Sequence, residues 1–252
     1  MRKSSSTDTL EQKAQNGPAI SARKIERRYG NRKALRKVTF DLPRGATLVI
    51  FGANGAGKTT LLRMLATLER PTAGDLRMFG LDPKEEGEAV RARLGFISHM
   101  PMLYVDLSAR ENLLLFAKLY GVENPEQRVD EMLEFVKLTY RRDDPVRGFS
   151  RGMMQRMSIA RALIHDPELV LLDEPYSGLD PHATAMAESL FKAEPGKHTI
   201  VMTSHDLERG YEAATHLLLL CRGTQVLFAP KEDISFADFQ TAYNQQLQKG
   251  NA

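Results

Sequence analysis

A phosphate-binding loop is predicted by glycines, a lysine and a threonine spaced as G-x-x-x-x-G-K-T over Gly52-Ala53-Asn54-Gly55-Ala56-Gly57-Lys58-Thr59. The glycines allow tight turns that point backbone N–H groups at phosphate oxygens. Lys58 can reach the β- and γ-phosphates of a nucleoside triphosphate, and the Thr59 hydroxyl can ligate Mg²⁺. An apolar run, Leu48–Phe51, precedes the loop, and a helical pattern begins at Thr60, which we expect to contact the nucleotide together with the loop residues. This context favours a functional loop over the alternative, a chance glycine-rich turn.

Two adjacent carboxylates, Asp173 and Glu174, end a second apolar run at Leu169–Leu172. Ligands of α/β sheets bind at the carboxyl ends of strands, and neighbouring strand residues point to opposite faces. The two acids can therefore do different work. Asp173 can hold Mg²⁺ through water, and Glu174 can act as a general base toward an attacking water. For this motif alone, the alternative is a strand that ends in a solvated acidic turn.

A third segment, Phe149-Ser150-Arg151-Gly152-Met153, precedes an amphipathic helical pattern. Ser150 can cap that helix, whose dipole favours an anion in front of it. Together the three segments resemble the Walker A, Walker B and signature motifs of the ABC (ATP-binding cassette) ATPases. Ser150 and Gly152 match the usual signature, Leu-Ser-Gly-Gly-Gln, whereas Phe149, Arg151 and Met153 depart from it. The resemblance implies that Ser150, Gly152 and Met153 contact ATP held by another subunit.

The resemblance assigns roles to three further residues. Tyr29 matches the aromatic residue that stacks on adenine, and a tyrosine at a strand edge is the alternative. Asp180, at the end of Ser177–Asp180, matches the D-loop aspartate that organises the opposing subunit's site. His205 ends an apolar strand pattern that begins at Thr199, and it matches the switch histidine. That histidine hydrogen-bonds the γ-phosphate and orients the attacking water.

His99 departs from the family pattern, because most relatives have a glutamine at this point after a strand. An imidazole nitrogen is a poorer ligand for Mg²⁺ than an amide oxygen. We hypothesise that His99, as a catalytic residue and metal ligand, weakens the metal contact; the alternative is that it packs against a membrane partner. The Ser98-His99 pair resembles the haem-exporter ATPases of cytochrome c maturation, which usually continue with glutamine where this chain has Met100.

Composition and charge restrict the class of protein. A net charge of +3 is too small to predict nucleic-acid binding. No apolar run approaches the ~18 residues of a membrane span. The single cysteine, Cys221, rules out a disulfide within the chain and suits the cytoplasm. We expect a cytoplasmic protein that is peripheral on the inner face of the cell membrane. The histidines that match no catalytic position are interpreted as solvated or capping residues: His165, His182, His198 and His216.

The expected fold is α/β, with a P-loop NTPase (RecA-like) core, an antiparallel β region and an inserted α-helical subdomain. The predicted parts, in chain order, are a disordered tail at 1–18, a single ABC ATPase domain at 19–228 and a C-terminal appendage at 229–252. Within the domain, the core and its β region are predicted at 19–98 and 166–228, and the helical subdomain at 99–165. In the helical part, Ser108 and Glu111 have the spacing of a capping box at a helix start.

The family resemblance implies an ATP-hydrolysing subunit of an ABC transporter, an exporter by preference, with ATP and Mg²⁺ as cofactors. Its expected partners are transmembrane permease subunits and a second ATP-binding subunit, identical or similar, in a head-to-tail dimer. Candidate contacts for the permease are the apolar residues Met100, Met102, Leu103 and Tyr104, with the core of the helical subdomain as their alternative role. For the whole chain, the alternatives are a soluble ABC-type assembly or regulatory factor and a nucleotide-binding module with little turnover.

Overall fold

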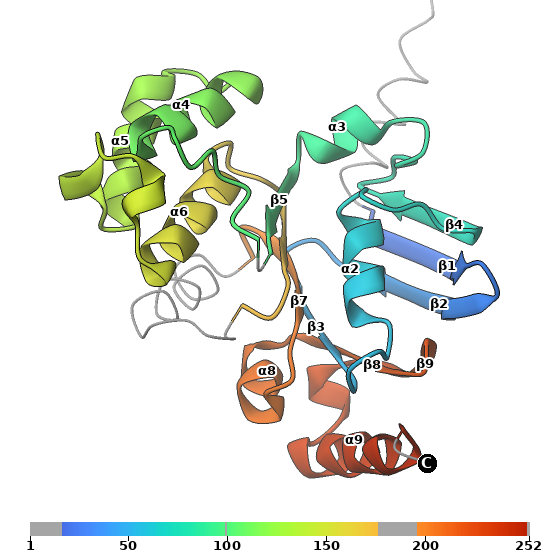
Figure 1. The fold of residues 1–252 in the computed structure, drawn as a ribbon. Coiled ribbons are helices and arrows are strands. Elements are labelled where there is room, and N and C mark those ends of the chain that lie inside the picture. Colours follow the sequence, from blue (N-terminus) through green and yellow to red (C-terminus); the bar gives the residue numbers. More distant parts are fainter. Residues whose placement is uncertain (1–16, 99, 176–195, 251–252) are drawn as a thin grey trace, which may run out of the picture. The chain divides into compact units, whose positions relative to one another are not determined.

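The computed structural model describes residues 17–98, 100–175 and 196–250, which belong to two compact units (Figure 1). Unit 1 contains the chain up to Arg91 and again from Thr199, and unit 2 contains Ala92 to His198. Unit 2 is therefore an insertion into the sequence of unit 1. The domain boundaries given above stay a prediction, and most of the tail predicted at 1–18 lies outside the described residues.

The sheet of unit 1 has its described strands in the order β4-β1-β2-β9-β8-β3-β7. β1 pairs antiparallel with β2 and β4, which gives the antiparallel β region that the sequence predicts. β3 pairs parallel with β7 and β8, and β8 pairs antiparallel with β9. The bounds of these strands are β1 Ile20–Tyr29, β2 Arg32–Leu42, β3 Thr47–Phe51, β4 Ala73–Met78, β7 Thr199–Thr203, β8 His216–Cys221 and β9 Thr224–Pro230.

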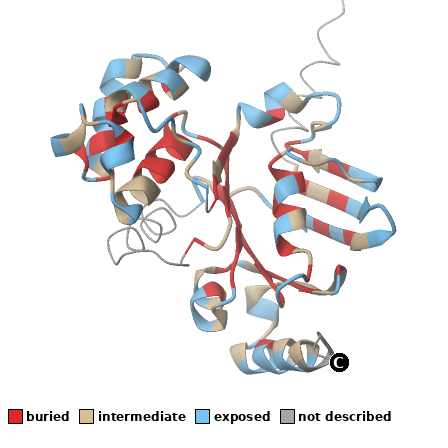
Figure 2. Cartoon of the chain, viewed as in Figure 1, coloured by how far each residue is buried: buried red, intermediate tan, exposed pale blue. Residues whose placement is uncertain are grey.

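The apolar centre of unit 1 lies along β3, β7 and β8, as the red segments of Figure 2 show. Every residue of β3 and of β7 is buried, and so are Leu217 to Leu220 of β8. Uninterrupted apolar runs of this kind are typical of parallel strands that are covered on both faces. The strands predicted at Leu48–Phe51 and from Thr199 are confirmed.

Helices cover the sheet of unit 1. α2 begins directly after the glycine-rich loop and buries one apolar side that includes Leu61 and Leu65. α9 lies beside β8, and its Phe239 is completely buried, so this C-terminal helix contributes to the core of unit 1. The bounds are α2 Lys58–Leu65, α3 Gly87–Arg91, α8 Leu207–Ala213, a short 3-10 helix Lys231–Asp233 and α9 Phe236–Gly250. None of the helices within the described ranges is both long and apolar enough to cross a membrane.

Unit 2 combines a parallel strand pair with packed helices. β5 and β6 pair in register over their whole length, and α4, α5 and α6 pack against one another. Ser108 and Glu111 form the predicted capping box, because the Ser108 hydroxyl accepts from the Glu111 N–H and the Glu111 carboxylate accepts from the Ser108 N–H. The bounds are β5 Leu94–Ile97, α4 Ala109–Leu119, α5 Pro125–Phe135, 3-10 helices Thr139–Arg141 and Val146–Gly148, α6 Arg151–Leu163 and β6 Leu169–Leu172.

Candidate nucleotide-binding site

The loop between β3 and α2 depends on glycine at several points. Gly52, Gly55 and Gly57 have φ angles of 149°, 78° and 108°, a region that side chains disfavour. A Cβ on Gly52 would lie 2.4 Å from the Leu220 carbonyl oxygen, and one on Gly57 would lie 2.7 Å from Leu35 Cδ2. The loop therefore needs glycine both for its backbone conformation and for its close approach to neighbouring strands.

Lys58 turns its ammonium group back toward this loop. Its Nζ donates hydrogen bonds to the carbonyl oxygens of Gly52 at 2.7 Å and Ala53 at 3.3 Å, and its side chain is buried. Gly57 is the N-cap of α2 and offers no side-chain acceptor to the first turn of the helix, while Thr59 lies exposed beside it. Loop N–H groups, a helix N-terminus and an ammonium group together suit a polyphosphate, so these residues fit the triphosphate of ATP.

β7 brings His205 to the same end of the sheet. Thr203 pairs with Ile50, and the Ser204 N–H donates to the Ile50 carbonyl at 3.2 Å. The Ser204 hydroxyl and Asp206 then close a tight turn, in which His205 is exposed. Because β3 and β7 are parallel neighbours, His205 and the start of the loop follow adjacent strand ends, where ligands of α/β sheets bind.

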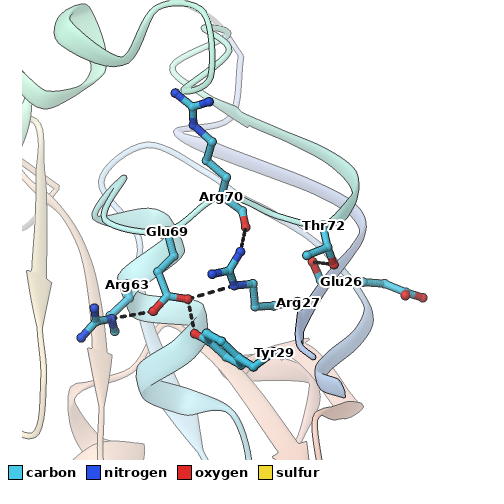
Figure 3. Close-up of polar contacts among 7 residues, drawn as sticks. All are labelled: Glu26, Arg27, Tyr29, Arg63, Glu69, Arg70 and Thr72. Atoms are coloured by element: carbon cyan, nitrogen blue, oxygen red, sulfur yellow. Dashed lines mark hydrogen bonds and ion pairs between the residues drawn. The ribbon is translucent and has the colours of Figure 1, made fainter. Parts of the chain in front are cut away.

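Tyr29 lies at the end of β1 and is 44% exposed. Its hydroxyl is hydrogen-bonded to the Glu69 carboxylate (Figure 3). The Arg27 guanidinium lies over its ring, 4.7 Å from the ring centre. The predicted adenine contact is thus an exposed ring with a fixed hydroxyl. Sequence reasoning missed both neighbours. Strand periodicity could have flagged Arg27, two residues before Tyr29, but nothing in the sequence pointed to Glu69.

In unit 2, Asp173 and Glu174 follow β6 directly. The Asp173 N–H donates to the Ile97 carbonyl at 2.9 Å, which holds Asp173 beside the end of β5. Glu174 has a left-handed backbone with φ of 51°, a conformation that costs about 1–2 kcal/mol in a residue with a Cβ. Because β6 ends at Leu172, strand alternation does not extend to this pair. The two carboxylates are placed differently because Glu174 has a left-handed backbone and Asp173 does not. This replaces the strand alternation that the sequence predicted for the pair.

Ser150 caps α6, as the sequence predicts. Its hydroxyl accepts a hydrogen bond from the Met153 N–H at 3.3 Å. Arg151 is exposed in this first turn, while Gly152 and Met153 are half-buried. The helix end that would face an anion is therefore accessible. The roles in ATP contact assigned to Ser150, Gly152 and Met153 stay predictions.

After β5, the Ser98 hydroxyl donates to the Met100 carbonyl at 2.8 Å and accepts from the Met100 N–H at 3.2 Å. His99 lies outside the described residues, and so does Asp180. Their predicted roles in metal binding and in the opposing subunit's site stay predictions.

The apolar residues that follow Ser98 are largely at the surface. Met100, Met102 and Tyr104 are 64%, 43% and 57% exposed, and Leu103 is half-buried. The alternative in which Met100, Met102 and Tyr104 form the core of the helical block is therefore wrong. These side chains form an exposed apolar segment.

Asn112, which sequence reasoning missed, fastens this segment to α4. Its side chain is completely buried, accepts from the Tyr104 N–H at 2.8 Å and donates to the Tyr104 carbonyl at 2.9 Å. It also donates to the carbonyls of Leu107 and Ser108. An asparagine within the apolar pattern of a helix was the available signal, since a buried amide needs local partners.

The interpretation of the remaining histidines as solvated or capping residues is wrong for His165 and His198, while His182 lies outside the described residues. His165 Nε2 donates to the Leu94 carbonyl at 2.9 Å, and its ring stacks on Tyr120 with centres 3.8 Å apart. Burial lowers the pKa of His165 to about 4, so the ring is neutral at pH 7. His198 Nδ1 hydrogen-bonds the Pro167 carbonyl at 2.7 Å.

Comparisons with known proteins agree with this fold and these motifs. Residues 35–177 match the family model described as ABC transporter. The chain is 34% identical over 86% of its length to the Nod factor export ATP-binding protein I of Cupriavidus pinatubonensis, and it covers 69% of that protein. It is 37% identical over 81% of its length to the bacitracin transport ATP-binding protein BcrA of Bacillus licheniformis, of which it covers 67%.

Solved structures show the same architecture. An ATP-binding subunit of an ABC transporter superimposes with a TM-score of 0.83 at 26% identity, covering 91% of this chain and 99% of the other. A dimeric ATP-binding cassette in a post-hydrolysis state, bound to ADP and Pi, shares the fold with a TM-score of 0.75 at 24% identity, covering 84% and 98%. The chain thus belongs to the ABC transporter family. It has the P-loop NTPase core of an ABC ATP-binding subunit, and it is an ATP hydrolase.

Proposed function

We propose that this chain is the ATP-binding subunit that powers an ABC exporter. The observation that carries the proposal is the loop from Gly52 to Lys58, where glycine backbone, the α2 N-terminus and a buried ammonium group combine in one cradle. The preference for export rests on relatives that are named for Nod factor export and for daunorubicin resistance.

Within this proposal, Lys58 neutralises phosphate charge, and Thr60, in the same helix turn, is a further nucleotide contact. The oxygen donors of Thr59 and Asp173 suit Mg²⁺. Bound Mg²⁺ would neutralise charge on the transferred phosphoryl group. Glu174 takes a proton from the attacking water, and His205 orients that water. Tyr29 stacks on adenine through the ring that is exposed at the end of β1.

A second ATP-binding subunit completes the site in our proposal. Ser150, Gly152 and Met153 of one copy would contact ATP held by the loop of the other, in a head-to-tail dimer, and Asp180 would organise the same contact. The capped, accessible start of α6 supports this role, because a helix N-terminus attracts a phosphate. Closure of the dimer would then move the permease subunits.

His99 is proposed to weaken the contact with Mg²⁺. Replacing His99 with glutamine should restore the amide ligand that most relatives carry, and so raise the apparent affinity for Mg²⁺ in ATP hydrolysis. A titration of ATPase activity with Mg²⁺ measures this directly. An unchanged Mg²⁺ dependence and rate would remove His99 from the metal site.

The exposed apolar segment of Met100, Met102 and Tyr104 is proposed to bind the permease, which would place the chain on the cytoplasmic face of the membrane. Exposed methionine and aromatic side chains suit an adaptable protein contact. The relatives described above are named for Nod factor, bacitracin and daunorubicin systems. Their names lend no support to the cytochrome c maturation role that Ser98-His99 suggested, which stays a prediction.

Purification of the tagged chain from detergent-solubilised membranes tests the proposal against a soluble factor. We expect a multispanning membrane protein to co-purify in stoichiometric amount. Replacing Met100, Met102 and Tyr104 with serine should release this protein without loss of ATP binding. Replacing Leu119 and Tyr140, which are even more exposed, with serine should leave it bound. Full ATPase activity in a chain that purifies without any membrane protein would favour the soluble alternative.

A further inference from the structure

One carboxylate, Glu69, joins three side chains from two elements of unit 1 (Figure 3). It accepts the Tyr29 hydroxyl, the Arg27 Nε–H at 3.1 Å and the Arg63 Nε–H at 2.8 Å. Its side chain is only 11% exposed. A carboxylate so far removed from water requires compensation, and two guanidinium groups and a hydroxyl provide it.

The backbone around Glu69 is anchored to α2. The N–H groups of Leu68 and Glu69 both donate to the Arg63 carbonyl, at 3.0 and 3.3 Å. Arg63 belongs to α2, the helix that starts at Lys58, so Glu69 and the phosphate-binding loop are attached to opposite ends of one rigid element. The position of the Glu69 carboxylate is thus tied to the position of the loop.

Arg27 completes the arrangement on the side of β1. It lies 4.7 Å from the centre of the Tyr29 ring, and its Nη1 donates to the Arg70 carbonyl at 2.9 Å. Its contacts with Tyr29, and then with Glu69, raise the pKa of Arg27 against the effect of burial, so the guanidinium stays charged. One face of the Tyr29 ring is therefore covered by a cation, which leaves the opposite face for a base.

We propose that Glu69 is a positioning residue for nucleotide binding, which fixes the Tyr29 ring at a set distance from the phosphate-binding loop. This inference rests on the proposed function, since it requires that Tyr29 stacks on adenine. Without Glu69 the exposed ring loses its hydroxyl partner and adopts other rotamers. Base and triphosphate would then no longer fit their two contacts at once, and part of the ATP affinity would be lost.

Binding of Mg-ATP and of Mg-tripolyphosphate to the full chain, measured by calorimetry, separates this role from a structural one. Tripolyphosphate contacts the loop but has no base. We expect Glu69→Ala to raise the Kd of ATP about fivefold and to change that of tripolyphosphate less than about twofold. Tyr29→Ala should raise the Kd of ATP about tenfold or more, with the same selectivity.

A control is available on the antiparallel pair of β1 and β2, at the end opposite Tyr29. Asp41→Asn breaks the exposed ion pair between Arg23 and Asp41 and should leave both affinities unchanged. The double variant Tyr29→Ala/Glu69→Ala should bind ATP no more weakly than Tyr29→Ala, because Glu69 acts through the ring.

The outcomes distinguish the inference from the function on which it rests. If Tyr29→Ala leaves ATP affinity unchanged, the adenine contact is refuted and the inference with it. If Tyr29→Ala weakens ATP binding but Glu69→Ala behaves like Asp41→Asn, only the inference is refuted. An equal loss of ATP and tripolyphosphate affinity in Glu69→Ala, or additive losses in the double variant, would also overturn it.

Discussion

Phe239 of the C-terminal helix packs edge-on against Phe51, the last residue of β3, with ring centres 4.9 Å apart. Phe51 is completely buried, and the next residue is Gly52, where the phosphate-binding loop begins. A helix near the end of the sequence therefore supports the strand end from which the loop departs. Through this contact the C-terminal helix packs into the core of unit 1 directly beneath the phosphate-binding loop's starting point.

Phe239→Ala should lower the free energy of unfolding by about 3–5 kcal/mol, because it removes a fully buried aromatic ring. It should also weaken ATP binding, since Phe51 then loses a neighbour. Urea denaturation and calorimetry measure the two effects. Phe236→Ala is the control, because that ring contacts Tyr211 with centres 5.1 Å apart. If both variants reduce ATP affinity equally, the Phe51 contact has no special role.

Two glycines of the loop should respond differently to the same substitution. At Gly57 a Cβ would lie 2.7 Å from Leu35 Cδ2 and 2.8 Å from the Ala34 carbonyl, whereas at Gly55 it would meet nothing within 4 Å. Both have positive φ, so both alanines are strained. We expect Gly57→Ala to abolish measurable ATP binding and Gly55→Ala to cost about tenfold or less. Similar affinities in the two variants would contradict this account of the loop.

The chemistry of the loop and the elements on either side of it follow from local sequence. The apolar run Leu48–Phe51 predicts the buried strand β3 that precedes the loop. In unit 2, the Ser108 and Glu111 pair likewise predicts the start of α4. Both signals depend on neighbouring residues only. The contacts between Glu69 and Tyr29, or Phe239 and Phe51, join residues far apart in sequence. Neither residue of such a pair carries a sign of its partner, so tertiary structure was needed to find them.

Some local signals were also misleading. His165 sits beside Asp166 and Pro167, in a segment that looks like a solvated turn, yet its ring is stacked on Tyr120. By contrast, the apolar residues around Met100 and Tyr104 left a contact surface and a core open as alternatives, and the structure shows that these side chains are exposed. Apolar composition cannot distinguish a core from a contact surface.

Removing the Asn112 amide should loosen the exposed apolar segment. In Asn112→Leu the N–H and carbonyl of Tyr104 lose their partners, which should cost about 2 kcal/mol and increase amide exchange between residues 100 and 107. Gln127→Ala removes an amide whose one bonding partner among the described residues is the exposed Glu131, and should change neither quantity. Unchanged exchange in Asn112→Leu would show that Asn112 does not order the segment.

His165 should make stability depend on pH. Burial is the main cause that lowers its pKa from 6.5 to about 4. Within the described structure its buried Nδ1 has no hydrogen-bond partner, so an N–H formed there by protonation would have no acceptor. The unfolded chain therefore binds a proton that the folded chain resists, so stability is lost as pH falls from about 6.5 to about 4. The loss amounts to about 3 kcal/mol at most. Between pH 6.5 and pH 4, the free energy of unfolding in urea should fall by about 3 kcal/mol more for wild type than for His165→Phe. Parallel plots of this free energy against pH for the two proteins would refute the prediction.

The most direct test of the account is ATP turnover and dimer formation in Glu174→Gln. If Glu174 is the general base, the rate of hydrolysis should fall at least about 100-fold while the Kd of ATP stays within about twofold of wild type. Size-exclusion chromatography should then show a dimer with ATP that Ser150→Arg abolishes. Near-normal turnover in Glu174→Gln, or a chain that remains monomeric with saturating ATP, would contradict the account.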